Sequence, residues 1–163
     1  FILPTNNLKM ADYLIAETNE DYKTAAILFK AYAAWLNVDL SFQHFDEELT
    51  ELKTMYGAPC AGLILCKQED EFIGCVGIRK IDSSVAELKR MFIKPAFQKQ
   101  GMGKELLQRA IELAQALNYK AIRLDTLNYM IPAINLYKKY GFYEIPAYYN
   151  NPNETAVYFE LKC

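Results

Sequence analysis

The sequence has few of the residue types that build metal centres. Its 163 residues include one histidine and four cysteines, and no two cysteines stand in a C-x-x-C pair. A zinc site needs more ligands at closer spacing, so we expect no metal site. Cys66 and Cys75 lie inside apolar runs, where a free cysteine behaves as a small core residue. We therefore expect a reducing, cytoplasmic setting.

Long apolar runs and a dominant charge are absent too. No run approaches the roughly 20 apolar residues that a helix needs to cross a bilayer. The first residues lack the basic and apolar segments of a signal peptide. The net charge is only −2, which excludes a general nucleic-acid binder by bulk charge. We expect neither a membrane nor a nucleic acid as a partner.

The small net charge hides an uneven distribution. Residues 1–88 hold 14 acids and 7 bases, whereas residues 89–163 hold 6 acids and 11 bases. An excess of one sign attracts ligands of the other sign. The second half is therefore predicted to meet something anionic.

The composition suits one packed domain. Hydrophobic residues make up 52% and charged residues 23% of the chain, which is typical of globular proteins and excludes disorder. The length predicts a single domain over residues 1–163.

The periodicity predicts eleven elements. They are a strand at Tyr13–Glu17, helices from Thr18 to Leu36 and over Asp46–Met55, strands at Ala61–Lys67, Phe72–Ile81 and Val85–Ile93, a helix at Gly101–Leu117, a strand at Lys120–Thr126, a helix at Pro132–Tyr140, and strands at Phe142–Ile145 and Ala156–Leu161. Hairpins come first and a strand–helix–strand crossover follows. This order predicts an α/β protein of the α+β type, with a mixed sheet and helices on both faces.

A glycine-containing segment joins a strand to the longest helix of the second half. It runs from Gln98 to Lys104 and places Gly101 and Gly103 at the helix start. The first amides of a helix have no internal partners, and together with the helix dipole they favour an anion. Five bases and no acids lie between Lys89 and Lys104. The segment is therefore predicted to cradle a phosphate.

Three other interpretations of the glycines are weaker or fail. A Gly-x-Gly at a helix start can be only a tight turn. The dinucleotide-binding fingerprint needs a third glycine, which is missing here. The P-loop needs Ser or Thr after Gly-Lys, but Glu105 follows Lys104.

Gln98, Gly101 and Gly103 form the pattern Gln-x-x-Gly-x-Gly, and here the sequence resembles the GCN5-related N-acetyltransferases, the GNAT family. A second segment resembles the same family through Asn128, Ala133, Leu136, Tyr137, Gly141 and Phe142. The resemblance is dense from Glu87 to Phe142, and the element order agrees over nearly the whole chain. It implies the GNAT fold: a mixed, mostly antiparallel central sheet whose two central strands splay apart.

The resemblance implies acetyl-CoA as co-substrate, held between the strands Val85–Ile93 and Lys120–Thr126. The amide of Met91 would polarise the thioester carbonyl, as an oxyanion site does. Gln98 would shape the loop, and Asn128 would hold the pantetheine arm from the second strand. The cofactor-binding residues implied in this way are Met91, Phe92, Ile93, Gln98, Lys99, Gly101, Met102, Gly103, Lys104, Asn128 and Tyr137.

The resemblance implies transfer of acetyl to a primary amine of a small molecule, by direct attack of the amine on the thioester. Tyr137 stands where the family has the acid that protonates the leaving thiolate, unless it is only a packed helix residue. Glu87, eleven residues before Gln98, is the implied base, and its apolar neighbours are expected to raise its pKa. Otherwise Glu87 is a structural carboxylate paired with Lys89 or Arg90, and a water is the base.

The sequence also predicts partners or positions for four other residues. Asp125 is a second candidate carboxylate beside Glu87, unless it only pairs with Arg123 across the strand face. Tyr148 and Tyr149 either line the acceptor pocket or pack the last hairpin. We expect Trp35 in the core.

The single histidine, His44, is expected at the surface or in a helix cap. Because the first helices shape the acceptor site in this family, their acids suggest that the acceptor arrives as a cation. Two other functions stay open: acetylation of a protein lysine or N-terminus, and a non-catalytic module that senses acyl-CoA. A homodimer also stays open.

Overall fold

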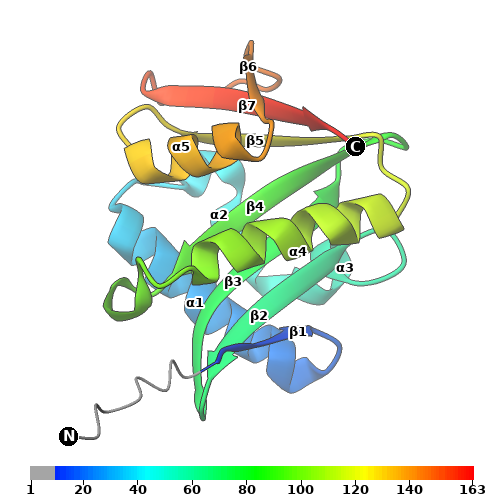
Figure 1. The fold of residues 1–163 in the computed structure, drawn as a ribbon. Helices are drawn as coiled ribbons and strands as arrows, with labels where there is room; N and C mark the ends of the chain where they lie inside the picture. The colour runs from blue at the N-terminus through cyan, green and yellow to red at the C-terminus, as the bar shows by residue number, and fades with distance from the viewer. Residues whose placement is uncertain (1–9) are drawn as a thin grey trace, which may run out of the picture.

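The computed structural model describes residues 10–163, and its centre is a seven-stranded sheet (Figure 1). In sheet order the strands are β1 (Asp12–Ile15), β2 (Gly62–Gln68), β3 (Glu71–Lys80), β4 (Val85–Ile93), β5 (Ala121–Leu127), β7 (Ala156–Lys162) and β6 (Tyr143–Ile145). All neighbouring strands are antiparallel except β4 and β5, which are parallel. The expected mixed, mostly antiparallel sheet is confirmed.

The helices begin and end close to where the sequence predicts them. They are α1 (Asn19–Leu36), η1 (Ser41–Gln43), α2 (Phe45–Thr50), α3 (Leu52–Tyr56), η2 (Pro95–Phe97), α4 (Met102–Ala116) and α5 (Ile131–Lys139). A capping box starts α1: the Thr18 hydroxyl accepts from the Asp21 amide, and the Asp21 carboxylate accepts from the Thr18 amide.

The single helix expected over Asp46–Met55 is two short helices, so that prediction is wrong. The backbone of Glu51 has φ −122° and ψ 23°, which interrupts the helix between α2 and α3. The interruption turns the chain so that Glu48 and Tyr56 meet inside the protein, where the tyrosine hydroxyl donates to the carboxylate at 2.5 Å. Periodicity could not show this turn, because both short helices keep an apolar stripe.

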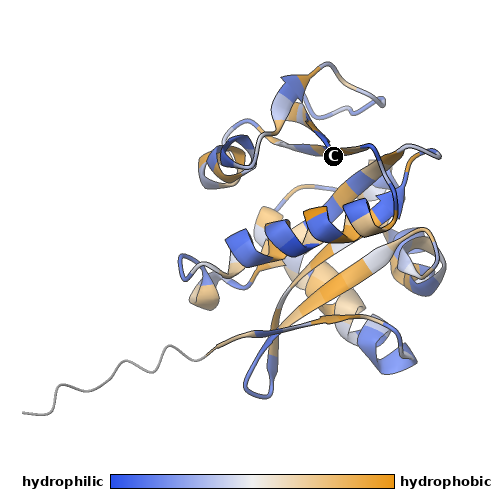
Figure 2. Cartoon of the chain, turned by 45° about the vertical axis from the view of Figure 1, so that its right-hand side comes forward, coloured by the Kyte–Doolittle hydropathy of each residue, from blue (hydrophilic) through white to orange (hydrophobic). Residues whose placement is uncertain are grey.

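Hydrophobic cores cover both faces of the sheet. On one face α4 and α5 pack on the strands, and α4 turns its hydrophilic residues outward (Figure 2). On the other face α1 and α3 pack on the strands. Trp35, expected in the core, is 40% exposed and packs one side of its ring against Phe92 and Tyr32, so that prediction is wrong.

The two central strands splay apart, as the resemblance implies. β4 pairs with β5 only from Val85 to Glu87, and beyond that point the two strands separate (Figure 1). On its other side β4 carries a bulge: Arg90 has φ 57°, and neither Arg90 nor Met91 has a partner in β3. The bulge interrupts the alternation of faces along β4, so that Lys89 and Arg90 both reach the side of α1 and α2.

Because the Tyr56 ring packs closely on Gly77 of β3, one added methyl group at Gly77 is predicted to destabilise the protein. A Cβ at Gly77 would lie 2.4 Å from the Tyr56 ring, whereas a Cβ at Gly103 would meet nothing within 4 Å. We expect Gly77→Ala to lower the free energy of unfolding by about 1–3 kcal/mol through overpacking. Urea unfolding measures this, with Gly103→Ala as the matched control. Equal stability of both variants would contradict the packing described here.

Candidate active site

The glycine loop has the geometry of an anion site. The Gln98 side chain donates to the carbonyl of Ile93 at 2.8 Å, which fixes the turn between β4 and the loop. Gly101 has φ 86°, a left-handed conformation that favours glycine, and α4 begins after it without a side-chain cap. Among residues 10–163, no acceptor takes the amides of Gly101, Met102, Gly103 and Lys104. An anion can therefore approach these four amides.

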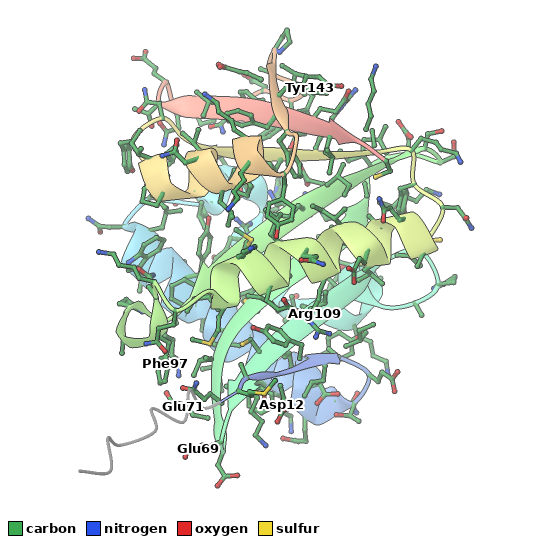
Figure 3. The ribbon with its side chains drawn as sticks, viewed as in Figure 1. Asp12, Glu69, Glu71, Phe97, Arg109 and Tyr143 are labelled. Carbon is green, nitrogen blue, oxygen red and sulfur yellow. The ribbon has the colours of Figure 1, made fainter. Side chains whose placement is uncertain are left out.

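Of the five bases between Lys89 and Lys104 that are expected around this loop, only two lie beside it. Lys99 and Lys104 are exposed there. Lys94 pairs with Glu71 at 3.0 Å, at the end of the sheet where Figure 3 shows Glu71 and Phe97. Lys89 and Arg90 point to the opposite side, so the prediction that all five surround the phosphate is wrong.

A small cavity of about 50 Å³ lies where β4 and β5 separate. Its lining includes Tyr32, Leu88 and Thr126. The side chains of Phe92 and Ile93 are buried in the cores on opposite faces, so these two residues can offer a ligand only their backbone groups. Two other predicted residues lie outside the lining of this cavity: Met91 is half-buried on the bulge, and Asn128 is exposed directly after β5.

Tyr137 is buried on α5, with its ring against Phe142 and Phe159. Its hydroxyl makes no hydrogen bond to another residue of the described chain. Burial raises the pKa of Tyr137, and the nearby Tyr32 and Asp125, which both line the small cavity, raise it further. The phenol therefore keeps its proton at neutral pH and can donate it.

Glu87 is paired rather than isolated. It is 4% exposed, and its two oxygens accept from Arg79 Nε at 2.9 Å and from the Tyr148 hydroxyl at 2.6 Å. Burial alone would raise the pKa of Glu87, but Lys89, Arg79 and the bond from Tyr148 outweigh burial and lower it. The expected raised pKa is wrong, because the apolar neighbours in sequence do not face the carboxylate.

Asp125 also has other partners than expected. It accepts from the Tyr149 hydroxyl at 2.8 Å and lies 4.0 Å from Lys89 Nζ. Arg123 pairs with Glu160 of β7 at 2.7 Å instead. The alternative that Asp125 pairs with Arg123 is wrong, because Tyr149 in the segment between β6 and β7 binds Asp125, and Glu160 of β7 binds Arg123.

Sequence reasoning missed Gln43 and Arg79 as site residues, and it placed Glu48 at the acceptor site rather than in this buried network. The Gln43 amide oxygen accepts from Arg90 at 2.8 Å and from Lys89 at 3.3 Å, and Glu48 accepts from Arg90 at 3.0 Å. Arg79 stands directly opposite Glu87 in the β3–β4 register. Counting back from the hairpin turn could have found Arg79, whereas no local pattern marks the other two.

A larger cleft of about 640 Å³ adjoins this network. It lies between the end of β3, the first half of β4, η1 and the segment 148–150. Tyr148 and Tyr149 line it and also pack their rings on Tyr158 of β7, so their packing on the last hairpin is confirmed, and their place in the acceptor pocket stays a prediction. His44 lies exposed between η1 and α2, at the surface as expected.

Comparison with known proteins decides the family. The profile of the acetyltransferase (GNAT) family matches residues 29–142. The chain belongs to the GNAT acetyltransferase family. It is 31% identical to an uncharacterized N-acetyltransferase of Dictyostelium discoideum, over 89% of this chain and 95% of that protein. As a family member it is an acetyl-CoA-dependent N-acetyltransferase.

Solved GNAT structures share the fold. An acetyltransferase from Streptococcus agalactiae superposes with a TM-score of 0.77 at 18% identity, covering 94% of this chain and 98% of that one. A GNAT acetyltransferase from Elizabethkingia anophelis, solved with acetyl-CoA bound, gives a TM-score of 0.67 at 23% identity, covering 94% and 98%.

Within residues 10–163, no group of three or more His, Cys, Asp or Glu side chains could hold a metal ion. In that same part of the chain, no helix is both long and apolar enough to cross a membrane.

None of the acids that the sequence places on the first helices lines the large cleft: Glu20, Asp21, Asp46, Glu47, Glu48 and Glu51. Glu48 is buried against Arg90 and Tyr56 instead. The charged residues that do line the cleft include Arg79 and Lys89. That the acids of the first helices attract a cationic acceptor therefore stays a prediction, without support from the lining of this cleft.

The glycine loop predicts a variant that loses the co-substrate and keeps the fold. Gly103→Glu adds a carboxylate in open space beside the free amides, so it repels the CoA phosphates without a clash. We expect CoA binding to be lost in isothermal titration and the melting temperature to stay unchanged. Gln115→Glu, an exposed position on the same helix, is the matched control. Wild-type CoA affinity in Gly103→Glu would rule out this loop.

The lowered pKa of Glu87 predicts a pH-dependent stability. A carboxyl whose folded pKa is lowered stabilises the protein above its unfolded pKa, near 4.5, and this contribution is lost as pH falls through the folded pKa. We expect Glu87→Gln to destabilise by about 1–3 kcal/mol at pH 7, and by less at acid pH. Urea unfolding at several pH values measures this, with exposed Glu144→Gln as control. A difference independent of pH would contradict the pairing.

Proposed function

We propose that this GNAT enzyme moves the acetyl group of acetyl-CoA to a primary amine of a small molecule, by direct attack of the amine on the thioester. One observation carries the proposal. The small cavity between β4 and β5 and the larger cleft share Phe42, Gln43 and Lys89 in their linings. An amine in the cleft is therefore adjacent to an acetyl group presented between the strands.

The fit of the loop and the splayed strands to acetyl-CoA supports the first half of the proposal. The free amides of Gly101 to Lys104 suit a pyrophosphate, and a side chain at Gly103 would occupy the space over them. The unpaired edge of β4 suits an extended arm that bonds as an added strand. The bulge leaves Met91 without a partner in β3, which supports its amide as the donor to the thioester carbonyl. Acetyl-CoA itself supplies the activated acetyl group.

Tyr137 is proposed to move a proton, and Glu87 is proposed to hold the ammonium form of the acceptor. Tyr137 keeps its proton at neutral pH and is proposed to donate it to the leaving thiolate. An amine has a pKa near 10.4 and must lose a proton before it attacks. Glu87 is ionised in the cleft, but a carboxylate of lowered pKa is a weak base. This favours loss of the amine's proton through water, with Glu87 holding the ammonium by its charge.

The proposal extends to the domain, the cellular location and the oligomeric state. We place residues 1–163 in one acetyltransferase domain, which the continuous sheet from β1 to β6 supports. We place the enzyme in the reducing cytoplasm, which the four free cysteines support. A homodimer stays a prediction.

Release of free CoA thiol tests the proposed activity. The protein is incubated with acetyl-CoA and a panel of primary amines, together with lysine peptides and peptides with a free N-terminus. Thiol release with a small amine supports the proposal, and a clear preference for peptides supports a protein acetyltransferase instead. Tight CoA binding without turnover on any amine would identify a sensor.

The role of Tyr137 has its own test. We expect Tyr137→Phe to lower kcat more than it raises KM, because the lost proton transfer occurs in the transition state. Steady-state kinetics across pH measures both. Tyr140→Phe, in the cap of the same helix, is the matched control. A pH–rate profile identical to that of the wild type would remove Tyr137 as the acid.

A further inference from the structure

The large cleft carries more positive than negative charge. Arg79, Lys80 and Lys89 line it, against the single carboxylate of Glu87. Arg79 and Lys89 come from the neighbouring strands β3 and β4, and Lys80 is exposed at the rim. A cleft of this charge attracts a ligand with an anionic group and repels one that carries only positive charge.

Lys89 is buried with few close partners. Its side chain is 5% exposed, and within residues 10–163 its only hydrogen bond is the 3.3 Å contact with Gln43. The carboxylates of Glu87 and Asp125 stand 3.9 and 4.0 Å away. An ammonium has three donors, so two of them have no close acceptor here.

The two facing carboxylates are already engaged by closer groups. Arg79 and Tyr148 bind Glu87, and Tyr149 binds Asp125. A buried ammonium with unfilled donors is costly unless something pairs with it. Because Lys89 lines both the cleft and the cavity between the strands, a ligand in either can supply the missing acceptor.

We propose that the acceptor is an amino acid, with a carboxylate one carbon away from the primary amine that is acetylated. The carboxylate binds Lys89 and the guanidinium of Arg79, whose side chain is 27% exposed. The amine then lies beside Glu87, which stands 3.9 Å from Lys89 and attracts the ammonium form. On β4, Glu87 and Lys89 place a negative and a positive group side by side, which matches the ammonium and the carboxylate of an amino acid.

The rest of the lining indicates what kind of side chain the amino acid carries. Phe42, Met55 and Ile81 add apolar surface to the cleft. An apolar or aromatic side chain would bury this surface, whereas a second cationic group would lie near Lys80. The inference rests on the proposed acetyl transfer, and it names the class of acceptor for that site.

Matched acceptors test the carboxylate directly. L-Phenylalanine, L-phenylalaninamide and 2-phenylethylamine share a ring and a primary amine, and only the first carries a carboxylate. L-Methionine and its amide form a second set. We expect kcat/KM for the free amino acids to exceed that for their amides roughly ten- to hundredfold, since a hydrogen bond to a charged group contributes that much. Amides that react equally well or better would overturn the inference.

Variants assign the effect to residues. Lys89→Gln should erase the preference for the carboxylate while CoA affinity and circular dichroism stay unchanged, and Lys80→Gln should reduce it less. Lys30→Gln, exposed on α1, is the matched control and should keep the full preference. A preference that survives in Lys89→Gln would overturn the assignment.

A binding measurement separates this inference from the proposed activity. The melting temperature of the CoA-loaded protein is measured with each acceptor. If the free amino acids raise it and their amides do not, but no thiol is released, the carboxylate site stands and the activity fails. If thiol is released only with acceptors that lack a carboxylate, the activity stands and the inference fails. No rise with any free amino acid would also overturn the inference.

Discussion

The separation of β4 from β5 is the constraint on which the rest of the structure depends. Two parallel strands that part inside a sheet leave two rows of backbone groups without partners, and buried groups of this kind must be satisfied. The pairing holds only as far as Glu87. Beyond it, the bulge at Arg90 turns the strand, and the buried pair between Arg90 and Glu48 ties the bulge to α2. The gap in which we propose that the thioester lies is therefore held by charged side chains on the side of α1 and α2.

A gain in folding stability does not explain why four charged side chains are buried together. Taking ions out of water costs free energy that their attraction only partly offsets, and apolar residues of similar size often stabilise as well or better. Glu48, Glu87, Lys89 and Arg90 are all buried in one connected network. Such a network fixes positions, because each member has a partner only in one arrangement. Members of this network line both the small cavity and the large cleft, so the network fixes the shape of both.

Much of the fold could be predicted from the sequence, because it depends on local patterns. The bounds of β4 agree to the residue, and the glycine loop, the capping box at Thr18 and the crossover through α4 follow from spacing and turn chemistry. The errors arise where contacts are distant. The sequence pattern of β4 does not reveal its bulge. Sequence reasoning therefore places Lys89 and Arg90 beside the phosphate, whereas they lie on the side of α1 and α2. The pKa of Glu87 was inferred from its neighbours in sequence, but Arg79 and Tyr148 set it from other strands.

The two entrances to the site lie at opposite ends of β4. The glycine loop follows the last residue of the strand, whereas the cleft opens beside its first half. Each substrate can therefore enter and leave while the other stays in place. Such an arrangement favours a ternary complex with sequential kinetics over a ping-pong cycle, in which an acylated enzyme would wait for its second substrate. It also lets the far side of the cleft diverge in shape, because changes there leave the glycine loop untouched.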